Sequence, residues 1–139
     1  MVEPISDEHR LIHEAVQELG LLAEAVIRGR SQLGVVLERR LDEVRVMMAR
    51  HHARESQAVL PALARGNGWG VILARHLAEV HRHQLTLLEE AAVPGLRCQI
   101  ERAVRIRVLA LALQDDLHQE QRWMSLLPRP ARGGTDFRS

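Results

Sequence analysis

Apolar residues recur at intervals of three and four along most of the chain, which is the spacing of one face of an α-helix. In the first segment Ile12, Val16 and Leu19 follow this spacing. Ser6 stands directly before two acidic residues, an arrangement typical of a helix N-cap. Helix-forming residues dominate throughout, and the one alternating stretch that would suit a strand, residues 104–108, lies inside a long helical segment. We therefore expect four helices, over approximately residues 6–29, 33–60, 69–92 and 96–127.

Glycine and proline separate the four periodic segments, because neither residue continues a helix well. The breaks lie at Gly29, Pro61, residues 66–68, residues 93–95 and Pro128. Four long helices joined by short connections bury their apolar faces most simply as an all-α, antiparallel up-down four-helix bundle. We expect residues 1–128 to form this single domain and residues 129–139 to be a disordered tail.

The composition is that of a globular protein and excludes several classes of partner. Among 139 residues, 46% are hydrophobic and 27% charged, and the net charge is only +1. This balance gives no electrostatic reason to expect nucleic acid as a partner. Cys98 is the single cysteine, so no internal disulfide can form. Without a signal peptide or an apolar run of membrane-spanning length, we expect a cytoplasmic protein that does not contact membranes.

The segment HHARESQAVLP places titratable groups on an apolar helix face. His51 and Glu55 are four residues apart and share the face of Val44 and Met48. A carboxylate buried there without a partner costs several kcal/mol. Imidazole and carboxylate from facing helices are the groups that hold iron, manganese or zinc in helical bundles. We therefore interpret His51 and Glu55 as candidate metal ligands.

An internal repeat extends the candidate site to further histidines. His51 is followed eight to ten residues later by Val-Leu-Pro, and His118 is followed at the same offsets by Leu-Leu-Pro. His9 precedes His51 by 42 residues, and His76 precedes His118 by the same 42. Equal spacing in two antiparallel hairpins predicts that all four histidines lie at one level of the bundle and converge.

The chain resembles the hemerythrin-like HHE cation-binding family over about residues 5–128. The segments that carry the resemblance are DEHRLI, HHARESQAVLP, RHLAEV and HQEQRWMSLLP. The resemblance implies a four-helix bundle with a non-haem di-iron site, in which two metal ions are bridged by carboxylates. The ligands that it implies are His9, His51, Glu55, His76 and His118.

One departure from the family pattern affects the expected number of metal ions. The family has a carboxylate four or five residues after its last histidine, whereas here these positions hold Arg122 and Trp123. A guanidinium about 6 Å from a divalent ion raises the energy by about 5 kcal/mol at an effective dielectric constant near 20. Arg122 must therefore turn outward or pair with an acid such as Asp115, or one metal position is weakened.

Several alternatives for the ligands stay open at this point. His81 or His83 could take the place of His76, and Glu79 or Glu120 could supply the missing carboxylate. The site could then hold two metal ions, one or none.

The leading hypothesis is a hemerythrin-like protein that binds non-haem iron and binds or senses dioxygen, nitric oxide, peroxide or iron itself. Binding or sensing is favoured over catalysis, because the sequence gives no sign of a substrate pocket and has no tyrosine that could serve as a radical or proton donor. An enzyme with a single metal ion, such as one that removes peroxide, is a third reading. Nucleophilic and phosphoryl chemistry have no support, because no nucleophilic triad or phosphate loop is present. The alternative is a metal-free, degenerate bundle that acts as an interaction or structural module, with self-association into a homo-oligomer. Imidazoles bind metal only when neutral, so affinity is expected to fall as pH drops through about 6.5.

Overall fold

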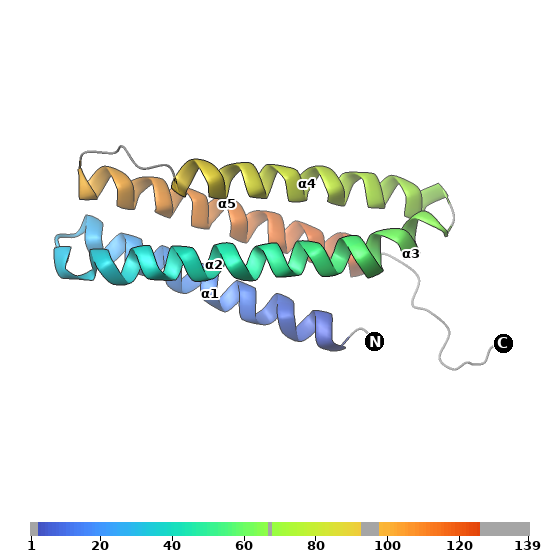
Figure 1. Cartoon of the computed structure of the whole chain (residues 1–139), viewed down its shortest axis with the longest axis horizontal. Helices are drawn as coiled ribbons and strands as arrows, with labels where there is room; N and C mark the ends of the chain where they lie inside the picture. Colours follow the sequence, from blue (N-terminus) through green and yellow to red (C-terminus); the bar gives the residue numbers. More distant parts are fainter. Residues whose placement is uncertain (1–2, 67, 93–97, 126–139) are drawn as a thin grey trace.

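The structure is a computed structural model that describes residues 3–66, 68–92 and 98–125, and within these ranges all of its secondary structure is helical (Figure 1). The elements are α1 (Glu3–Ile27), the 3₁₀-helix η1 (Ser31–Leu33), α2 (Gly34–Arg54), the π-helix η2 (Glu55–Val59), α3 (Leu60–Ala64), α4 (Gly68–Ala92) and α5 (Gln99–Ser125). The all-α prediction is confirmed for the described residues. The tail predicted over 129–139 lies outside them.

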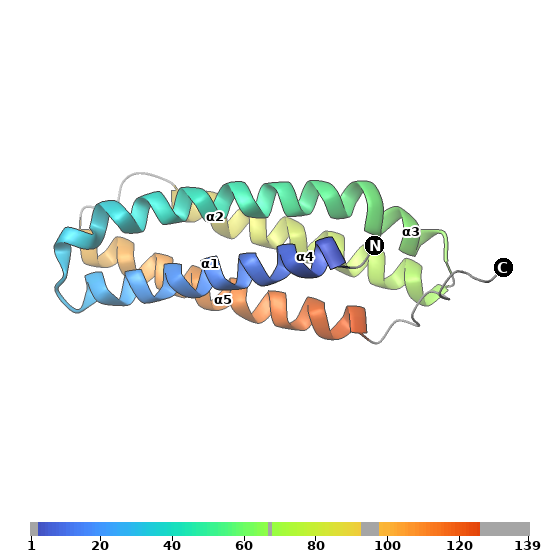
Figure 2. The ribbon, with the colours of Figure 1, turned by 90° about the horizontal axis from the view of Figure 1, so that it is seen from below.

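The four long helices α1, α2, α4 and α5 lie side by side along the longest axis of the molecule (Figures 1 and 2). The connection from α1 to α2 lies at one end of the molecule, together with the end of α4 and the start of α5. The short helix α3 and the start of α4 lie at the opposite end, near the start of α1. A side chain on the inner face of any of these helices therefore points into a space that all four share.

The apolar stripes predicted from the sequence form this common core. Ile12, Val16 and Leu19 of α1 are fully buried. The stripes of α2 and α5 are buried in the same way, at Leu37, Leu41, Val44, Met48, Ala103, Ile106, Ala110, Leu113 and Leu117. Each fully buried leucine or isoleucine contributes about 1.5–3 kcal/mol of transfer free energy. The interior of the bundle is therefore apolar except where the cluster described below interrupts it.

Helix α1 ends close to Gly29, as the sequence predicted. The amide of Arg30 donates to the carbonyl of Ala25, and the amide of Gly29 donates to that of Val26, both at 3.0 Å. These two bonds form a Schellman motif, and Gly29 adopts the positive φ of 107° that this motif requires. The helix begins at Glu3 instead of after the predicted N-cap at Ser6, because a proline is tolerated in the first turn.

The second predicted helix does not stop at Pro61. After α2 the chain widens into η2, and α3 then continues with Pro61 in its first turn. A proline ring clashes with the carbonyl four residues before it and has no N–H to donate. The five-residue π-helix opens the helix directly before that proline, so the chain passes it without a break.

Gly70 is required where α3 meets α4. A Cβ atom at this position would overlap the backbone carbonyl of Leu63, which cannot move as a side chain can. We expect Gly70→Ala to lower the free energy of unfolding by about 1–3 kcal/mol, measured by chemical denaturation.

Gly68→Ala is the matched control, because a Cβ atom there meets nothing within 4 Å. The control should leave stability unchanged or raise it by up to about 1 kcal/mol. Equal effects of the two substitutions would contradict the close approach of α3 and α4.

The outward face of α5 carries apolar side chains as well. Ile100, Val104, Val108 and Leu111 are all exposed, and they follow one another at helical spacing. Arg105 lies on the exposed surface of the same helix.

Within the described ranges, no helix is long and apolar enough to cross a lipid bilayer.

Candidate metal centre

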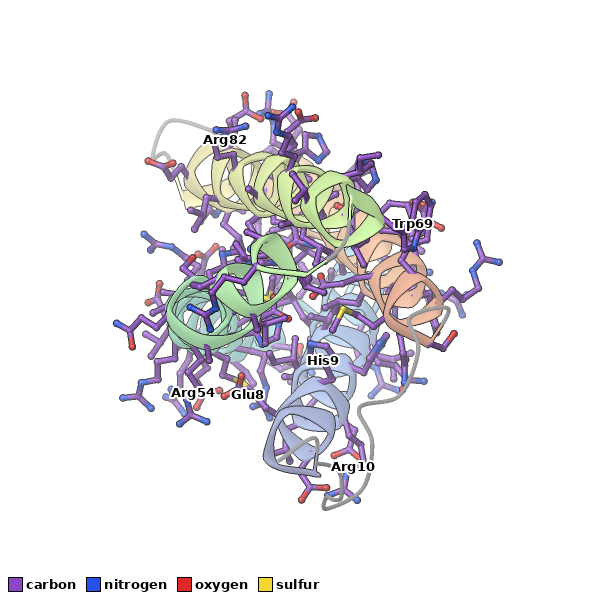
Figure 3. All side chains as sticks on the ribbon, turned by 90° about the vertical axis from the view of Figure 1, so that its right-hand side faces the viewer. Glu8, His9, Arg10, Arg54, Trp69 and Arg82 are labelled. Atoms are coloured by element: carbon purple, nitrogen blue, oxygen red, sulfur yellow. The ribbon has the colours of Figure 1, made fainter. Side chains whose placement is uncertain are left out.

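Histidine and glutamate side chains from all four long segments of the bundle meet inside it, near the end where α1 begins. His9 comes from α1, His51 from the last turn of α2, Glu55 from the first position of η2, His81 from α4 and Glu120 from α5. Figure 3, a view along the bundle, shows His9 directed between the helices and Arg10 directed away from them. His51, Glu55 and Glu120 are completely buried, and His81 nearly so. We call these five residues the inner cluster.

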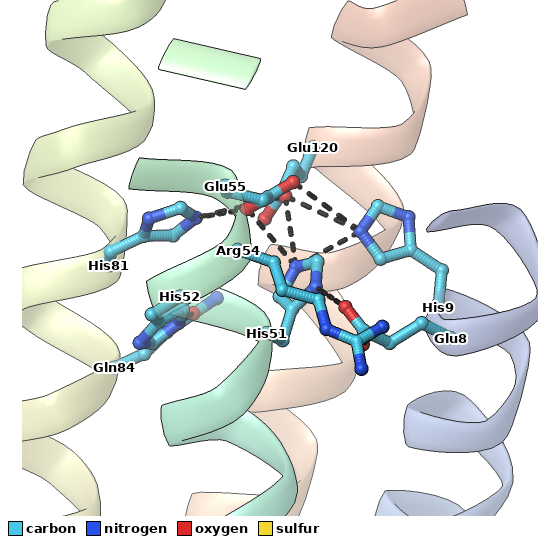
Figure 4. A network of polar contacts seen from close by, with 9 residues as sticks. All are labelled: Glu8, His9, His51, His52, Arg54, Glu55, His81, Gln84 and Glu120. Atoms are coloured by element: carbon cyan, nitrogen blue, oxygen red, sulfur yellow. Dashed lines mark hydrogen bonds and ion pairs between the residues drawn. The ribbon is translucent and has the colours of Figure 1, made fainter. Parts of the chain in front are cut away.

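The donor atoms of the inner cluster approach one another closely (Figure 4). The Nε2 atoms of His9 and His51 are 3.0 Å apart. The Nε2 atom of His51 lies 3.1 Å from Oε1 of Glu55 and 3.6 Å from Oε1 of Glu120. The Nε2 atom of His9 lies 3.6 Å from Glu55 Oε2 and 3.7 Å from Glu120 Oε1. These four residues each offer an atom within 4.8 Å of the other three.

His81 contacts the same carboxylates from the other side. Its Nε2 atom lies 2.7 Å from Oε1 of Glu55 and 3.8 Å from Oε1 of Glu120. Figure 4 shows His81 and His9 on opposite sides of the two carboxylates. Glu55 and Glu120 are thereby shared between two histidines of the first hairpin and one of the second.

The carboxylates of the inner cluster lack ordinary hydrogen bonds. All four oxygens of Glu55 and Glu120 are buried without a hydrogen-bond partner among the described residues, and so is Nε2 of His81. The short distance from His81 to Glu55 therefore does not correspond to an aligned N–H···O bond. Burying ionised carboxylates without such bonds costs several kcal/mol for each, and a bound cation offsets that cost. These side chains are therefore better arranged to bind a cation than to form hydrogen bonds with one another.

The spacing of the donor atoms also fits a transition-metal ion. Two ligand atoms held about 2.1 Å from one ion lie about 3.0 Å apart for bonds at 90° and about 3.6 Å apart at 120°. The Nε2 atoms of His9 and His51 lie 3.0 Å from each other and 3.1–3.7 Å from an oxygen of Glu55 or Glu120, and one donor atom of each of the four residues lies within 4.8 Å of the other three. Imidazole with carboxylate suits iron, manganese or zinc, whereas calcium and magnesium prefer oxygen ligands alone.

A third carboxylate, that of Glu8, sets the orientation of His51. The Nδ1 atom of His51 lies 2.8 Å from Oε1 of Glu8, and Oε2 of Glu8 pairs with Arg54 at 2.8 Å. The Nδ1–H donates to Glu8, so in the neutral imidazole Nε2 keeps its lone pair directed at the cluster. Histidines that bind metal commonly have such a carboxylate on their other nitrogen, because it fixes the ring and its tautomer.

This arrangement predicts that Glu8 supports metal binding without being a ligand. We expect Glu8→Gln to weaken metal affinity about 10–100-fold, because removing an outer partner of a ligating histidine typically has this effect. Competition with a chelator measures the change. Glu14→Gln, on an exposed position of the same helix, should leave affinity unchanged. An unchanged affinity in both variants would show that Glu8 does not orient His51.

Two of the histidines are strongly basic when no metal ion is bound. Burial by itself lowers the pKa of His51, but contacts with Glu120, Glu55 and Glu8 outweigh burial and raise this pKa to about 10. Burial likewise lowers the pKa of His81, and contacts with Glu120 and Glu55 raise it to about 9. At neutral pH both imidazoles therefore carry a proton that a metal ion must displace.

Glu55 remains ionised in this environment. Burial by itself raises the pKa of Glu55, but contacts with His51, His81 and His9 outweigh burial and lower it well below the usual range. A carboxylate that stays charged among imidazoles is available as a metal ligand without first losing a proton.

His52 lies behind the inner cluster and stays neutral. Its ring stacks on that of His81, with centroids 4.2 Å apart and an angle of 23° between the planes. Its Nε2–H donates to Oε1 of Gln84 at 2.8 Å. Burial and the neighbouring His81 lower the pKa of His52 to about 4. His52 therefore holds the ring of His81 in place and does not compete for the carboxylates.

The structure brings together three of the five residues predicted as ligands, namely His9, His51 and Glu55. It does not bring in His76 or His118. His76 is exposed and packs against Trp123, with ring centroids 4.0 Å apart, and His118 lies beside His13 at 4.7 Å. The predicted convergence of four histidines at one level is wrong for the second hairpin.

The 42-residue spacing did not identify the inward-facing residues of the second hairpin, because these residues are separated by a different number of positions than His9 and His51 are. His9 and His51 are separated by 42 residues, whereas His81 and Glu120 are separated by 39. His118 and Glu120 are two residues apart, or about 200° around the helix, so only one of them can face inward. Arg122 is exposed, as His118 is, so solvent screens its charge.

The two residues that replace them were among the open alternatives, and the local pattern favours both. Glu120 follows Leu113 and Leu117 at helical spacing on the buried stripe of α5. His81 follows Leu77 by four residues on the buried stripe of α4. The other two alternatives, His83 and Glu79, are exposed. Local periodicity was thus a better guide than the long-range repeat.

Comparison with known proteins adds no relationship to this geometry. No family model, no curated protein and no solved structure matches the chain.

Proposed function

We propose that this chain is a hemerythrin-like, antiparallel up-down bundle that binds non-haem iron at the inner cluster and uses it to bind or sense a small molecule. Dioxygen, nitric oxide and peroxide are the small molecules of suitable size and chemistry. The single observation that carries the proposal is the pair of completely buried carboxylates, Glu55 and Glu120, which have no hydrogen-bond partner in the described part of the chain and are surrounded by imidazole nitrogens. This combination is costly unless cations lie beside the carboxylates, either a metal ion or the protonated imidazoles of His51 and His81.

His9, His51, Glu55 and Glu120 would hold one ion, and His81 with the same carboxylates would hold a second. The two carboxylates lie between the two groups of histidines, which is where bridging ligands are needed. Bound iron supplies an open coordination position at which a diatomic molecule or peroxide can bind.

The protein residues contribute orientation, charge and exclusion of water. Glu8 fixes the ring of His51, and His52 stacks on the ring of His81. Two buried carboxylates offset the charge of one divalent ion. The apolar core of the bundle keeps bulk water away from the inner cluster. Without that water, the attraction between the carboxylates and a bound ion is stronger.

The metal-free interaction module remains the second candidate. One observation weakens the main argument for it, which is the positive charge of Arg122. The guanidinium of Arg122 was expected to repel a metal ion, but the residue is exposed on the outside of α5. What favours a metal-free state is that His51 and His81 can pair with Glu55 when protonated.

Metal analysis of the protein purified after growth with added iron separates these two functions. We expect one or two iron ions per chain, with an optical absorption band, and loss of both in His51→Ala. His76→Ala is the matched control, because His76 lies outside the inner cluster. A folded, iron-free wild-type protein that also binds no iron when reconstituted would support the interaction module instead.

A further inference from the structure

A surface pocket of about 500 Å³ lies between α1 and α5, next to the inner cluster. Its wall contains three histidines, His9, His13 and His118, together with three glutamines and Arg10. His9 belongs to both the pocket wall and the inner cluster, so the pocket adjoins the buried donor atoms. No described carboxylate lines it.

The pair of histidines at this pocket has the separation of two ligands on one ion. The ring centroids of His13 and His118 are 4.7 Å apart, and the planes are inclined at 50°. A ring centroid lies about 3.2 Å from an ion bound through the ring nitrogen, so two rings on bonds at 90° have centroids about 4.6 Å apart. The pair joins two different helices, so an ion between them would also link α1 to α5.

The chemistry of the wall selects the class of ion. Imidazole and amide groups without a carboxylate suit ions that prefer nitrogen ligands, such as Ni²⁺, Cu²⁺ or Zn²⁺, and suit Ca²⁺ and Mg²⁺ poorly. Arg10 is the opposing feature, because it brings positive charge to the rim. It is exposed to solvent and lies 3.6 Å from Asp7, so water and a carboxylate both reduce its effect.

We propose that His13 and His118 form an outer metal-binding site for such a divalent ion, and that ions pass from this site along His9 to the inner cluster. The outer site stands on its own geometry. The passage to the inner cluster rests on the proposed function.

The outer site is tested in the full-length protein with the inner cluster disabled by His51→Gln and Glu55→Gln, with Ni²⁺ alone as the probe. We expect one weakly held Ni²⁺ whose affinity falls at least about tenfold when His13→Gln and His118→Gln are added. His83→Gln is the control, because His83 is an exposed histidine away from the pocket. Equal Ni²⁺ binding with and without His13 and His118, in protein shown to be folded by circular dichroism, would overturn the proposal.

The passage of ions is tested in protein with an intact inner cluster, by following Co²⁺ uptake through its optical spectrum after rapid mixing. We expect His13→Gln with His118→Gln to slow filling of the inner cluster about tenfold and to leave the final Co²⁺ content unchanged, because the outer site raises the local ion concentration. An unchanged rate would overturn the passage. A wild-type chain whose inner cluster takes up no Co²⁺ would instead contradict the proposed function, and the Ni²⁺ result would still decide the outer site.

Discussion

Replacing Glu55 by glutamine is expected to weaken metal binding at the inner cluster by at least about a thousandfold. The carboxylate of Glu55 contacts imidazoles from α1, α2 and α4, so it is the common partner of the whole cluster. The amide is nearly the same size and loses only the charge and one acceptor. The loss should therefore exceed the 10–100-fold effect typical of residues one step further from a metal. Isothermal titration calorimetry with Zn²⁺ or Mn²⁺ measures it directly.

Glu120→Gln should have an effect of the same order, because its oxygen lies within 3.8 Å of Nε2 of His9, His51 and His81. Glu79→Gln is the matched control for both variants. From the sequence Glu79 was as good a candidate as Glu120, but its side chain is exposed on α4. Metal affinity that drops equally in the Glu79 variant, or in none of the three, would remove the inner cluster as the metal site.

The fold could be predicted because helical periodicity records burial directly. Ile12, Val16 and Leu19 are apolar at the spacing that places them in the core, and all three are buried there. The π-helix before Pro61 could not be predicted in this way, because it depends on how the widened turn packs and not on a residue pattern. It nevertheless matters for the site, since Glu55 is its first residue.

The site could be predicted only in part, for a related reason. His51 and Glu55 are four residues apart on one helix, so their shared face follows from helix geometry alone. Which residues of α4 and α5 lie opposite them depends on the lengths of the connections and the relative heights of the helices. A repeat of equal spacing cannot supply these heights, and it selected His118 where the inward position is held by Glu120.

The raised pKa values in the inner cluster revise the pH range expected from the sequence. Ordinary histidines would lose their protons near pH 6.5, and metal affinity would level off above that pH. Here the pKa of His51 is about 10 and that of His81 about 9 in the metal-free protein. Each of the two ions must displace the proton of its own histidine ligand, so the affinity for each ion should keep rising with pH, by up to about tenfold per unit between pH 7 and pH 9.

The shifted pKa values can also be checked in the metal-free protein. Between pH 6.5 and about 10 the folded protein holds a proton on His51 that the unfolded chain has lost. The folded state then binds more protons than the unfolded state, so the free energy of unfolding should fall as pH rises through this range. The low pKa of His52, about 4, acts in the opposite direction and removes stability as pH falls below 6.5. We therefore expect the metal-free protein to be most stable near pH 6.5, measured by denaturation with urea.

The number of protons released on metal binding tests the raised pKa values of His51 and His81 most directly. Calorimetric titration with Zn²⁺ at pH 7.5, repeated in buffers with different ionisation enthalpies, should show about one proton released per ion bound, and about two per chain when both positions fill. If His51 and His81 had ordinary pKa values, the imidazoles would already be neutral and fewer than about 0.5 protons would be released. His52→Gln should not change the count, because His52 is neutral at this pH. Release of two protons per chain that persists in Glu120→Gln, titrated at Zn²⁺ concentrations that fill the weakened site, would contradict the assignment, because Glu120 makes the largest contribution that raises the pKa of both histidines.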